Sequence, residues 1–368
     1  MDKEIISIRQ GIYMVAMFIT GSFMVMNTGD ETRQDIWIVI LMAMAITIPM
    51  LLVFSYLLKL HPGKNLFEIF IDIYGKITGK ILCLLYCWYA FHLGALVIRN
   101  FTEFVTTISF PETPQPIIAV FIGLLCIWIV KAGVEVIGRW SSFVFPLVAI
   151  NIILTVALST TKADMINLRP VLYNGIKTIL PGTFAVFAFP LAESIIFTMV
   201  FDSLKDIKKC FRVLLIGTLI GCFFMVIIAV RNIAVLGVEY SIDLYFPSYV
   251  AVRTLNIGEI VQRFEVVVAI TFILGGFIKI STCLYAAVKG FSKILNIDNY
   301  RPVSAPIGFL MMNLACILYS SLSEMFDWAI NIYQYYALPF QVIIPIVTLI
   351  VAKVKAGLKN KKLVSSQP

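Results

Sequence analysis

The chain alternates between long apolar runs and short polar connections. Each run is long enough to cross roughly 30 Å of hydrocarbon as an α-helix, which needs about 20 residues and satisfies its own backbone polar groups. Ten such runs lie at about 8–28, 36–59, 80–106, 115–131, 139–160, 183–201, 210–232, 258–290, 303–323 and 329–352. This pattern predicts an all-α membrane protein with ten transmembrane helices, since a β-barrel needs shorter strands of alternating polarity.

The order of the runs indicates two related halves within one polytopic membrane domain, residues 1–368. No connection is long enough to hold a soluble domain. The connection 161–182 separates a first repeat at about 8–160 from a second at about 183–352, and residues 353–368 form a short tail. A chain that crosses the membrane five times ends on the side opposite to where it began. The second five-helix unit would therefore be inverted relative to the first.

Two runs contain sequences that interrupt a helix, at corresponding positions in the two halves. The first run carries Thr20-Gly21-Ser22, where glycine weakens the helix and hydroxyl groups compete for backbone groups. The sixth carries Phe189-Pro190-Leu191-Ala192-Glu193, where proline removes a backbone donor and clashes with the preceding turn. Ordinary kinks would also explain these sequences, because glycine and proline are common in membrane helices.

Paired breaks are typical of a LeuT-like transporter architecture, a 5+5 inverted repeat with broken helices one and six. In that arrangement the ligand lies where the backbone is interrupted. We therefore expect ligand-binding residues at the two breaks and at a glycine pair in the eighth run. The predicted set is Thr20, Gly21, Ser22, Phe189, Pro190, Ala192, Glu193, Gly275 and Gly276.

The composition supports a membrane protein and restricts its partners. Hydrophobic residues make up 60% of the chain, charged residues 14%, and the mean hydropathy is +0.94. Most of the 29 lysines and arginines fall in connections on the N-terminal side of the membrane, which predicts that both termini are cytoplasmic. The net charge of +8 then faces anionic membrane lipid, and nucleic acid is not an expected partner.

Ionisable groups within the runs are candidates for function, because a charge in hydrocarbon costs about 2.5 to 3.5 kcal/mol on insertion scales. Glu193 follows the second break, and Lys279 follows the Gly275-Gly276 pair. Glu193 is either a carboxylate for a ligand or proton, or the partner of a buried cation. Lys279 either supplies a fixed charge where sodium-coupled transporters of this architecture place a cation, or pairs with Glu193. In both cases we expect Lys279 to be buried and paired.

Other polar groups have structural explanations. Arg99 and Glu103 are spaced i, i+4 near the end of the third run and are expected to form a surface ion pair. Glu259 and Arg263 have the same spacing and are expected to form a solvated pair. His92 is expected to make an interhelical hydrogen bond rather than to relay protons.

Nothing in the sequence supports an enzyme. Tyr333, Tyr335 and Tyr336 are explained by an aromatic belt near the end of the last run. The seven cysteines are expected to be small packing residues, and with two histidines in the chain a metal site has little support. There is no phosphate-binding glycine loop and no nucleophile elbow. We therefore expect no catalytic residue, no metal and no cofactor.

Several sequence blocks follow one another in an order that is specific to one family. The chain opens with Ile6-Ser7-Ile8-Arg9-Gln10, and the second half contains Arg231-Asn232-Ile233-Ala234-Val235-Leu236-Gly237, Phe246-Pro247-Ser248-Tyr249, Gln262-Arg263-Phe264-Glu265, Phe277-Ile278-Lys279-Ile280-Ser281 and Tyr285-Ala286-Ala287-Val288-Lys289-Gly290. The series resembles the membrane-embedded B subunits of spore germinant receptors, within the amino acid/polyamine/organocation superfamily. The resemblance covers essentially the whole chain and departs at Asn27-Thr28-Gly29, where relatives commonly have a proline.

The resemblance implies a germinant receptor in the inner membrane of the endospore, made with an A subunit and a lipoprotein C subunit. By likeness, Gly21 and Glu193 lie at breaks that line a pocket, and Lys279 lies in the motif of the eighth run. The implied ligand is a small nutrient, with an amino acid favoured. It would trigger germination by binding one conformational state more tightly than another.

Two other interpretations stay open at the level of sequence. A cation- or proton-coupled amino-acid transporter would use the same pocket and release its ligand inside. A scaffold or conducting subunit of an ion-release complex would carry a vestigial pocket.

Overall fold

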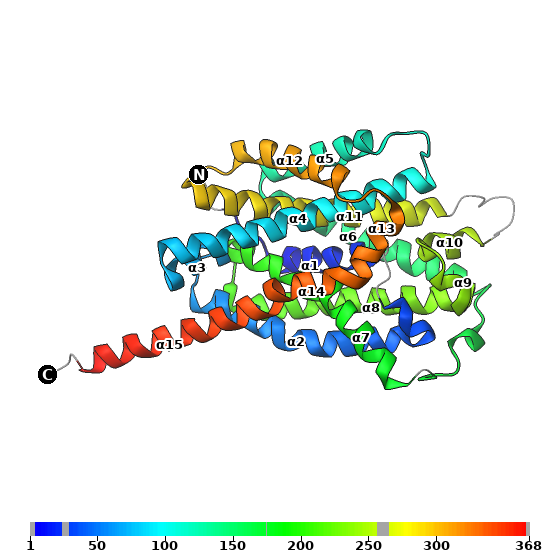
Figure 1. Ribbon diagram of the computed structural model, residues 1–368, viewed down its shortest axis with the longest axis horizontal. Coiled ribbons are helices and arrows are strands. Elements are labelled where there is room, and N and C mark those ends of the chain that lie inside the picture. Colours follow the sequence, from blue (N-terminus) through cyan, green and yellow to red (C-terminus); the bar gives the residue numbers. More distant parts are fainter. Residues whose placement is uncertain (1–3, 24–28, 174, 256–264, 366–368) are drawn as a thin grey trace.

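A computed structural model describes residues 4–23, 29–173, 175–255 and 265–365 as a bundle of helices (Figure 1). The α-helices are α1 (Ile8–Phe23), α2 (Ile36–Leu60), α3 (Leu66–Tyr74), α4 (Lys76–Ile108), α5 (Gln115–Ala132), α6 (Val134–Ser159), α7 (Ile176–Val186), α8 (Cys210–Leu236), α9 (Val238–Ile242), α10 (Pro247–Arg253), α11 (Glu265–Leu295), α12 (Ser304–Ile317), α13 (Leu322–Asp327), α14 (Tyr333–Leu338) and α15 (Ile344–Ser365). Most of them run along the long axis of the bundle, and α15 extends beyond it toward the C-terminus.

Short 3₁₀ and π-helical segments connect or interrupt these helices. They are η1 (Asp30–Asp35), η2 (Met165–Leu168), η3 (Phe187–Leu191), η4 (Ala192–Met199), η5 (Phe201–Ser203), η6 (Ile207–Lys209), η7 (Arg301–Val303), η8 (Trp328–Ile332) and η9 (Pro339–Ile343). Extended structure in the described part of the chain is limited to an isolated parallel bridge between Ile6 and Leu204.

Eight helical stretches within the described residues are long and apolar enough to cross a membrane, so the chain is a multi-pass membrane protein. These stretches are Thr32–Leu60, Lys76–Ile108, Gln115–Ala132, Val134–Ser159, Ile176–Met199, Ile207–Leu236, Glu265–Leu295 and Leu322–Ala356. The first and ninth predicted runs coincide with shorter helices, since α1 has 16 residues and Arg301–Ile317 belongs to the class of 10–17 residues. Helices therefore occur at all ten predicted runs, and eight of them have spanning length.

Helix α1 lies at the centre of the bundle. It packs against α8, α11 and α6, and Figure 1 shows it between the layer of α4 and α11 and the layer of α2 and α8. Every residue from Met14 to Phe23 is buried. Because α1 is surrounded by protein, polar side chains on it must find partners on other helices.

The predicted break at Thr20-Gly21-Ser22 is wrong, because α1 is continuous through Phe23. Gly21 instead permits a close helix contact: a Cβ built on Gly21 would lie 2.7 Å from the carbonyl carbon of Gly275, and one built on Gly275 would lie 2.6 Å from the Cα of Gly21. Small residues at such a crossing let two membrane helices meet backbone to backbone. The departure at Asn27-Thr28 lies outside the described residues.

The predicted interruption in the sixth run is confirmed. Helix α7 gives way to the π-helical turn η3, in which Phe189 has non-helical backbone angles of φ −133° and ψ 116°. Pro190 follows directly and cannot donate a backbone hydrogen bond. The chain then continues as the 3₁₀ helix η4, and every residue of η3 and η4 is buried.

The two adjacent glycines of α11 test the helix contact. The Gly275→Ala substitution places a methyl group against the α1 backbone, whereas a Cβ at Gly276 meets only a Phe101 ring carbon at 3.8 Å. Overpacking typically costs about 1–3 kcal/mol, so Gly275→Ala should lower the thermal unfolding temperature of the detergent-solubilised protein. Gly276→Ala is the matched control and should leave it unchanged or raise it, because alanine favours helix. Equal unfolding temperatures for both variants would contradict the backbone contact.

Candidate functional site

The centre of the bundle contains a buried ion pair between two predicted residues. Glu193 of η4 and Lys279 of α11 are both 0% exposed, and the Lys279 ammonium donates to Glu193 Oε2. The prediction that Lys279 is buried and paired is confirmed. The pair joins the segment after the interruption to the helix that touches α1.

Helix α1 and two aromatic rings complete the surroundings of Lys279. Its ammonium also donates to the Ser22 hydroxyl. Its Nζ lies 4.7 Å from the centre of the Phe18 ring and 4.9 Å from that of Phe189, and the π face of an aromatic ring stabilises a cation. Because α1 stays helical, Phe18 and Ser22 lie one turn apart on the same face, and both reach Lys279.

A series of polar side chains continues from Glu193 to α4. The Tyr333 hydroxyl donates to Glu193 Oε1 and lies 3.4 Å from the Tyr89 hydroxyl. Gln341 Nε2 donates to the Tyr89 hydroxyl at 2.9 Å and to the Ala188 carbonyl at 2.8 Å. The amide of Gln341 therefore satisfies a carbonyl within the interrupted segment, as a buried acceptor requires.

A small cavity lies beside this network. Its volume is about 20 Å³, which is enough for roughly one water molecule. It is lined by Leu93, Leu96, Val97, Asn100, Phe189, Tyr319, Met325, Trp328, Ala329 and Tyr333. Since Phe189 and Tyr333 also contact the ion pair, the cavity adjoins the charged centre, which is closed in this conformation.

Four of the predicted ligand residues belong directly to the interruption or the ion pair. Phe189 and Pro190 lie within η3, and Ala192 and Glu193 begin η4. All four are buried. The sequence pattern therefore located the interrupted segment correctly, and the binding of a ligand by these residues stays a prediction.

The other predicted ligand residues lie on α1 and α11. Gly21 and Gly275 form the helix contact, and Gly276 faces Phe101. The Thr20 hydroxyl is buried and has no hydrogen-bond partner in the described part of the protein. The structure thus places these residues in the packing around the ion pair, and their contact with a ligand also stays a prediction.

Three members of the network were not predicted. The aromatic-belt explanation is wrong for Tyr333, because its side chain is 3% exposed and its hydroxyl donates to Glu193. Tyr335, by contrast, is 64% exposed, as a belt residue would be. Tyr89 and Gln341 gave only a weak signal, namely an uncharged polar group within an apolar run.

Arg99 and Glu103 form the predicted ion pair, but the prediction that it lies on the surface is wrong. Their side chains are 5% and 7% exposed, and the Arg99 guanidinium also donates to the Cys316 carbonyl at 3.3 Å. The spacing i, i+4 correctly predicted the pairing. It carried no information on the neighbouring end of α12, which covers the pair.

His92 packs among aromatic rings, and its Nδ1 does not make the predicted interhelical hydrogen bond. Its Nδ1 is buried without a hydrogen-bond partner in the described structure, and its ring stacks on Trp88 with centroids 5.3 Å apart. The predicted pair of Glu259 and Arg263 lies outside the described residues.

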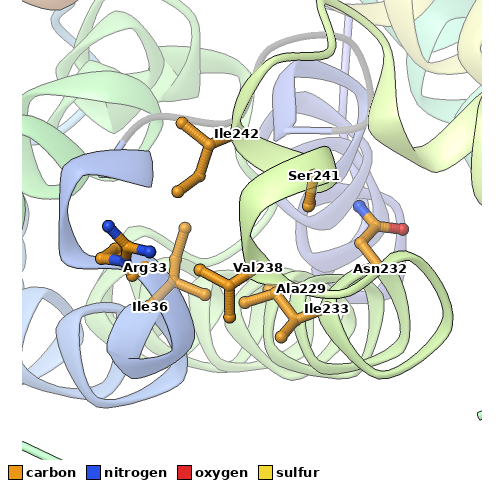
Figure 2. A pocket seen from close by; sticks show the side chains of 8 residues that line it. All are labelled: Arg33, Ile36, Ala229, Asn232, Ile233, Val238, Ser241 and Ile242. Atoms are coloured by element: carbon orange, nitrogen blue, oxygen red, sulfur yellow. The ribbon is translucent and has the colours of Figure 1, made fainter. Parts of the chain in front are cut away.

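A second pocket occurs where α2, α8 and α9 meet (Figure 2). It is lined by Arg33, Ile36, Ala229, Asn232, Ile233, Val238, Ser241 and Ile242 and has a volume of about 10 Å³. Arg33 also forms an ion pair with Glu239 of α9. None of the predicted ligand residues lines this pocket. Across the described ranges, no group of three His, Cys, Asp or Glu side chains is placed to hold a metal ion.

The fold and the interrupted helix define the protein as an all-helical membrane protein of LeuT-like transporter fold. The structure of MhsT in complex with L-phenylalanine is similar with a TM-score of 0.69 at 11% identity, covering 96% of this chain and 89% of that chain. The structure of MHP1, a nucleobase-cation-symport-1 family transporter, in a closed conformation with bromovinylhydantoin bound has a TM-score of 0.62 at 13% identity, covering 93% and 78%. At these identities the likeness shows the fold alone.

The chain belongs to the spore germination protein family, as the sequence blocks predicted. The family profile described as "Spore germination protein" matches residues 5–325. Spore germination protein KB of Bacillus subtilis (strain 168) is 29% identical over 367 residues, which are 98% of this chain and 98% of that protein. Spore germination protein YndE of the same organism is 27% identical over 303 residues, 81% of each.

Removing one partner of the central ion pair should destabilise the protein strongly. Lys279→Met leaves the Glu193 carboxylate buried without its cation, and Glu193→Gln leaves the ammonium without its anion. Breaking a buried pair in this way costs about 3–5 kcal/mol. We expect each single variant to lower the thermal unfolding temperature in detergent, and the double variant Glu193→Gln/Lys279→Met to recover much of the loss.

The exposed pair of Lys64 and Asp72 provides the control. Their side chains are 46% and 38% exposed, so Lys64→Met should change the unfolding temperature little. Additive losses in the double variant would show that Glu193 and Lys279 do not depend on each other.

Proposed function

We propose that this protein is the membrane-embedded, nutrient-binding subunit of a germinant receptor, with an amino acid as its ligand. The observation that carries the proposal is the buried pair of Glu193 and Lys279 beside an interrupted helix and a cavity. An amino acid carries one ammonium and one carboxylate. Opposite charges held at one site therefore match its two ends. The similar fold of a transporter that holds L-phenylalanine supports this ligand class.

The ligand would bind by exchanging partners with the internal ion pair. Its carboxylate would replace Glu193 as the partner of Lys279, and its ammonium would replace Lys279 as the partner of Glu193. Because the cavity has room for roughly one water molecule, the helices must separate before the exchange. A ligand that stabilises the separated state shifts the population toward it, and this shift would be the germination signal.

The chemistry of the network supports the exchange. Tyr333 donates to one oxygen of Glu193 while Lys279 donates to the other, so Glu193 keeps one partner when Lys279 turns to the ligand. Ser22 in the same way keeps contact with Lys279. Neither charge is then left alone in the membrane interior, where an unpaired ion is most costly.

The proposal includes an arrangement in the membrane and in a complex. Residues of about 8–160 and 183–352 form two inverted five-helix repeats of a ten-span domain, and both termini, including the tail 353–368, are cytoplasmic. The A and C subunits of the receptor are its protein partners in the inner membrane of the endospore. The support for this arrangement is the distribution of basic residues, the membership of the family and the likeness to transporters in fold.

A coupled amino-acid transporter is the second candidate function, because the solved structures of similar fold include a cation-coupled family of transporters. Both functions use the same site and differ in whether the ligand crosses the membrane. Proteoliposomes containing the purified chain separate them: a receptor subunit binds a radiolabelled amino acid with saturation but shows no counterflow, whereas a transporter shows both.

Binding of a panel of amino acids, sugars and nucleosides to the purified chain tests the proposed ligand. We expect saturable binding of an amino acid, reduced at least about tenfold, or roughly 1.4 kcal/mol, by Ala329→Trp. This substitution fills the cavity and keeps both charged side chains of the ion pair. Glu193→Gln should reduce binding as well, because it removes the partner of the ligand ammonium.

Ala157→Trp is the matched control, since Ala157 is exposed on α6, and it should bind like the unaltered protein. Gly21 is a poor probe, because a side chain there collides with the α11 backbone whether or not a ligand binds. Undiminished binding to Ala329→Trp, or binding of no panel member, would contradict the proposed site.

A further inference from the structure

Asn313 places an amide on the outer surface of α12. Its side chain is exposed and lies on the same face of the helix as the exposed side chains of Phe309, Leu310 and Ile317, because residues three and four positions apart share a face of an α-helix. Helix α12 packs against α4, α5 and α11, and Figure 1 shows it at the edge of the bundle. In a membrane, the face that carries Asn313 is therefore directed toward lipid.

Asn313 lies about halfway through the membrane. The residue before it, Met312, packs against Gly123, which is halfway along the 18-residue helix α5. Met311 packs against Gly94, near the middle of the 33-residue helix α4. Both of those helices are long and apolar enough to cross a membrane. The Asn313 amide is thus at the depth of the hydrocarbon and not at the level of the headgroups.

The amide of Asn313 keeps hydrogen-bonding groups that the described protein does not use. Its Nδ2 donates to the Phe309 carbonyl, one turn earlier in the same helix, at 3.1 Å. The second N–H of Nδ2 and the oxygen Oδ1 have no partner in the part of the chain that the structure describes. Lipid tails cannot provide one, and a polar group left unsatisfied in hydrocarbon is costly.

The neighbouring lipid-facing surfaces are apolar at this depth. Every exposed residue of α5 from Ile117 to Trp128 is apolar, and so is every exposed residue of α6 from Phe143 to Ala157. The Nδ2 of Asn151, also on α6, instead donates within the bundle, to the hydroxyl of Thr271 at 3.4 Å. An exposed asparagine in such a surface indicates a contact with another membrane helix, because polar side chains form hydrogen bonds between such helices.

We propose that this face of α12 forms a twofold-symmetric interface with the same face of a second copy of the protein. Two copies in one membrane have the same orientation, so a twofold axis along the membrane normal brings each residue of the face to its own counterpart at the same depth. The Oδ1 of each Asn313 accepts the free N–H of the other Asn313. Phe309, Leu310 and Ile317 provide the apolar packing around the two amides.

A second copy fits this face better than a different chain, because the amide is complementary to itself. Asn313 retains one free N–H and one free oxygen, which are the groups that its counterpart needs. A different membrane chain would require a polar group of its own at the same depth. The interface is also independent of the proposed nutrient site, since the hydrogen bonds of the Glu193 and Lys279 network involve no residue of α12.

Energy transfer between donor-labelled and acceptor-labelled copies of the full chain in liposomes tests the self-association. We expect transfer above that of random mixing, which rises with the protein-to-lipid ratio and saturates. Asn313→Leu should shift the midpoint about fivefold to tenfold toward higher protein content, as expected for the loss of two hydrogen bonds between helices. Asn151→Leu is the matched control, because it removes an asparagine that bonds within one copy, and its midpoint should not change.

Two results of this experiment would overturn the proposal. One is an unaltered protein that shows only the transfer of random mixing, in which case the partner of Asn313 belongs to a different membrane chain. The other is an Asn313→Leu variant with the midpoint of the unaltered protein.

Cysteine cross-linking in the same liposomes locates the interface. Leu310→Cys places a thiol one turn from Asn313 and keeps the amide, so mild oxidation should join two copies through a disulfide. Leu147→Cys is the matched control, because Leu147 is an exposed leucine on α6, and the unaltered chain controls for the seven native cysteines. Both controls should remain monomeric on a denaturing gel. No dimer of Leu310→Cys, or equal amounts of dimer in both variants, would overturn the proposed face.

Discussion

The ion pair of Glu193 and Lys279 constrains the centre of this protein more than any other interaction. Neither charge is exposed, and two ions taken out of water need both each other and further hydrogen bonds. Ser22 and Tyr333 provide those bonds, one on each partner. Ser22 can do so only if α1 approaches α11 closely. The contact of Gly21 with Gly275 is therefore part of the electrostatic arrangement and not merely a packing detail.

The interrupted sixth segment depends on the same centre. Pro190 prevents a regular helix, so carbonyls in η3 need hydrogen-bond donors from outside the helix. Gln341 reaches the Ala188 carbonyl and at the same time bonds to Tyr89, which links the interruption to α4. The break, the ion pair and the tyrosines thus form one connected network. Hydrogen bonds in such a network strengthen one another, so the loss of one member weakens the others.

The sequence predicted the elements that have local causes. Length and polarity located the membrane helices, proline located the interruption before Glu193, and the cost of buried charge predicted a paired Lys279. The break at Gly21 was wrong because a glycine weakens a helix and permits a close contact equally well. Only the neighbouring helix distinguishes the two. The network also contains Tyr89, Tyr333 and Gln341, which come from segments far apart in the sequence. No local sequence pattern predicts a contact between such segments.

The three buried cations of the described residues differ in how the protein satisfies them. Glu193 with Lys279 and Arg99 with Glu103 are satisfied by the protein's own side chains. The pair of Glu193 and Lys279 fixes η4 against α11, since separating the two segments exposes an uncompensated ion. Arg99 and Glu103 both lie on α4, and the Arg99 guanidinium also donates to a carbonyl at the end of α12. Arg231 of α8 is buried as well, and the hydrogen bond from its Nε to Asn232 orients the guanidinium without neutralising its charge.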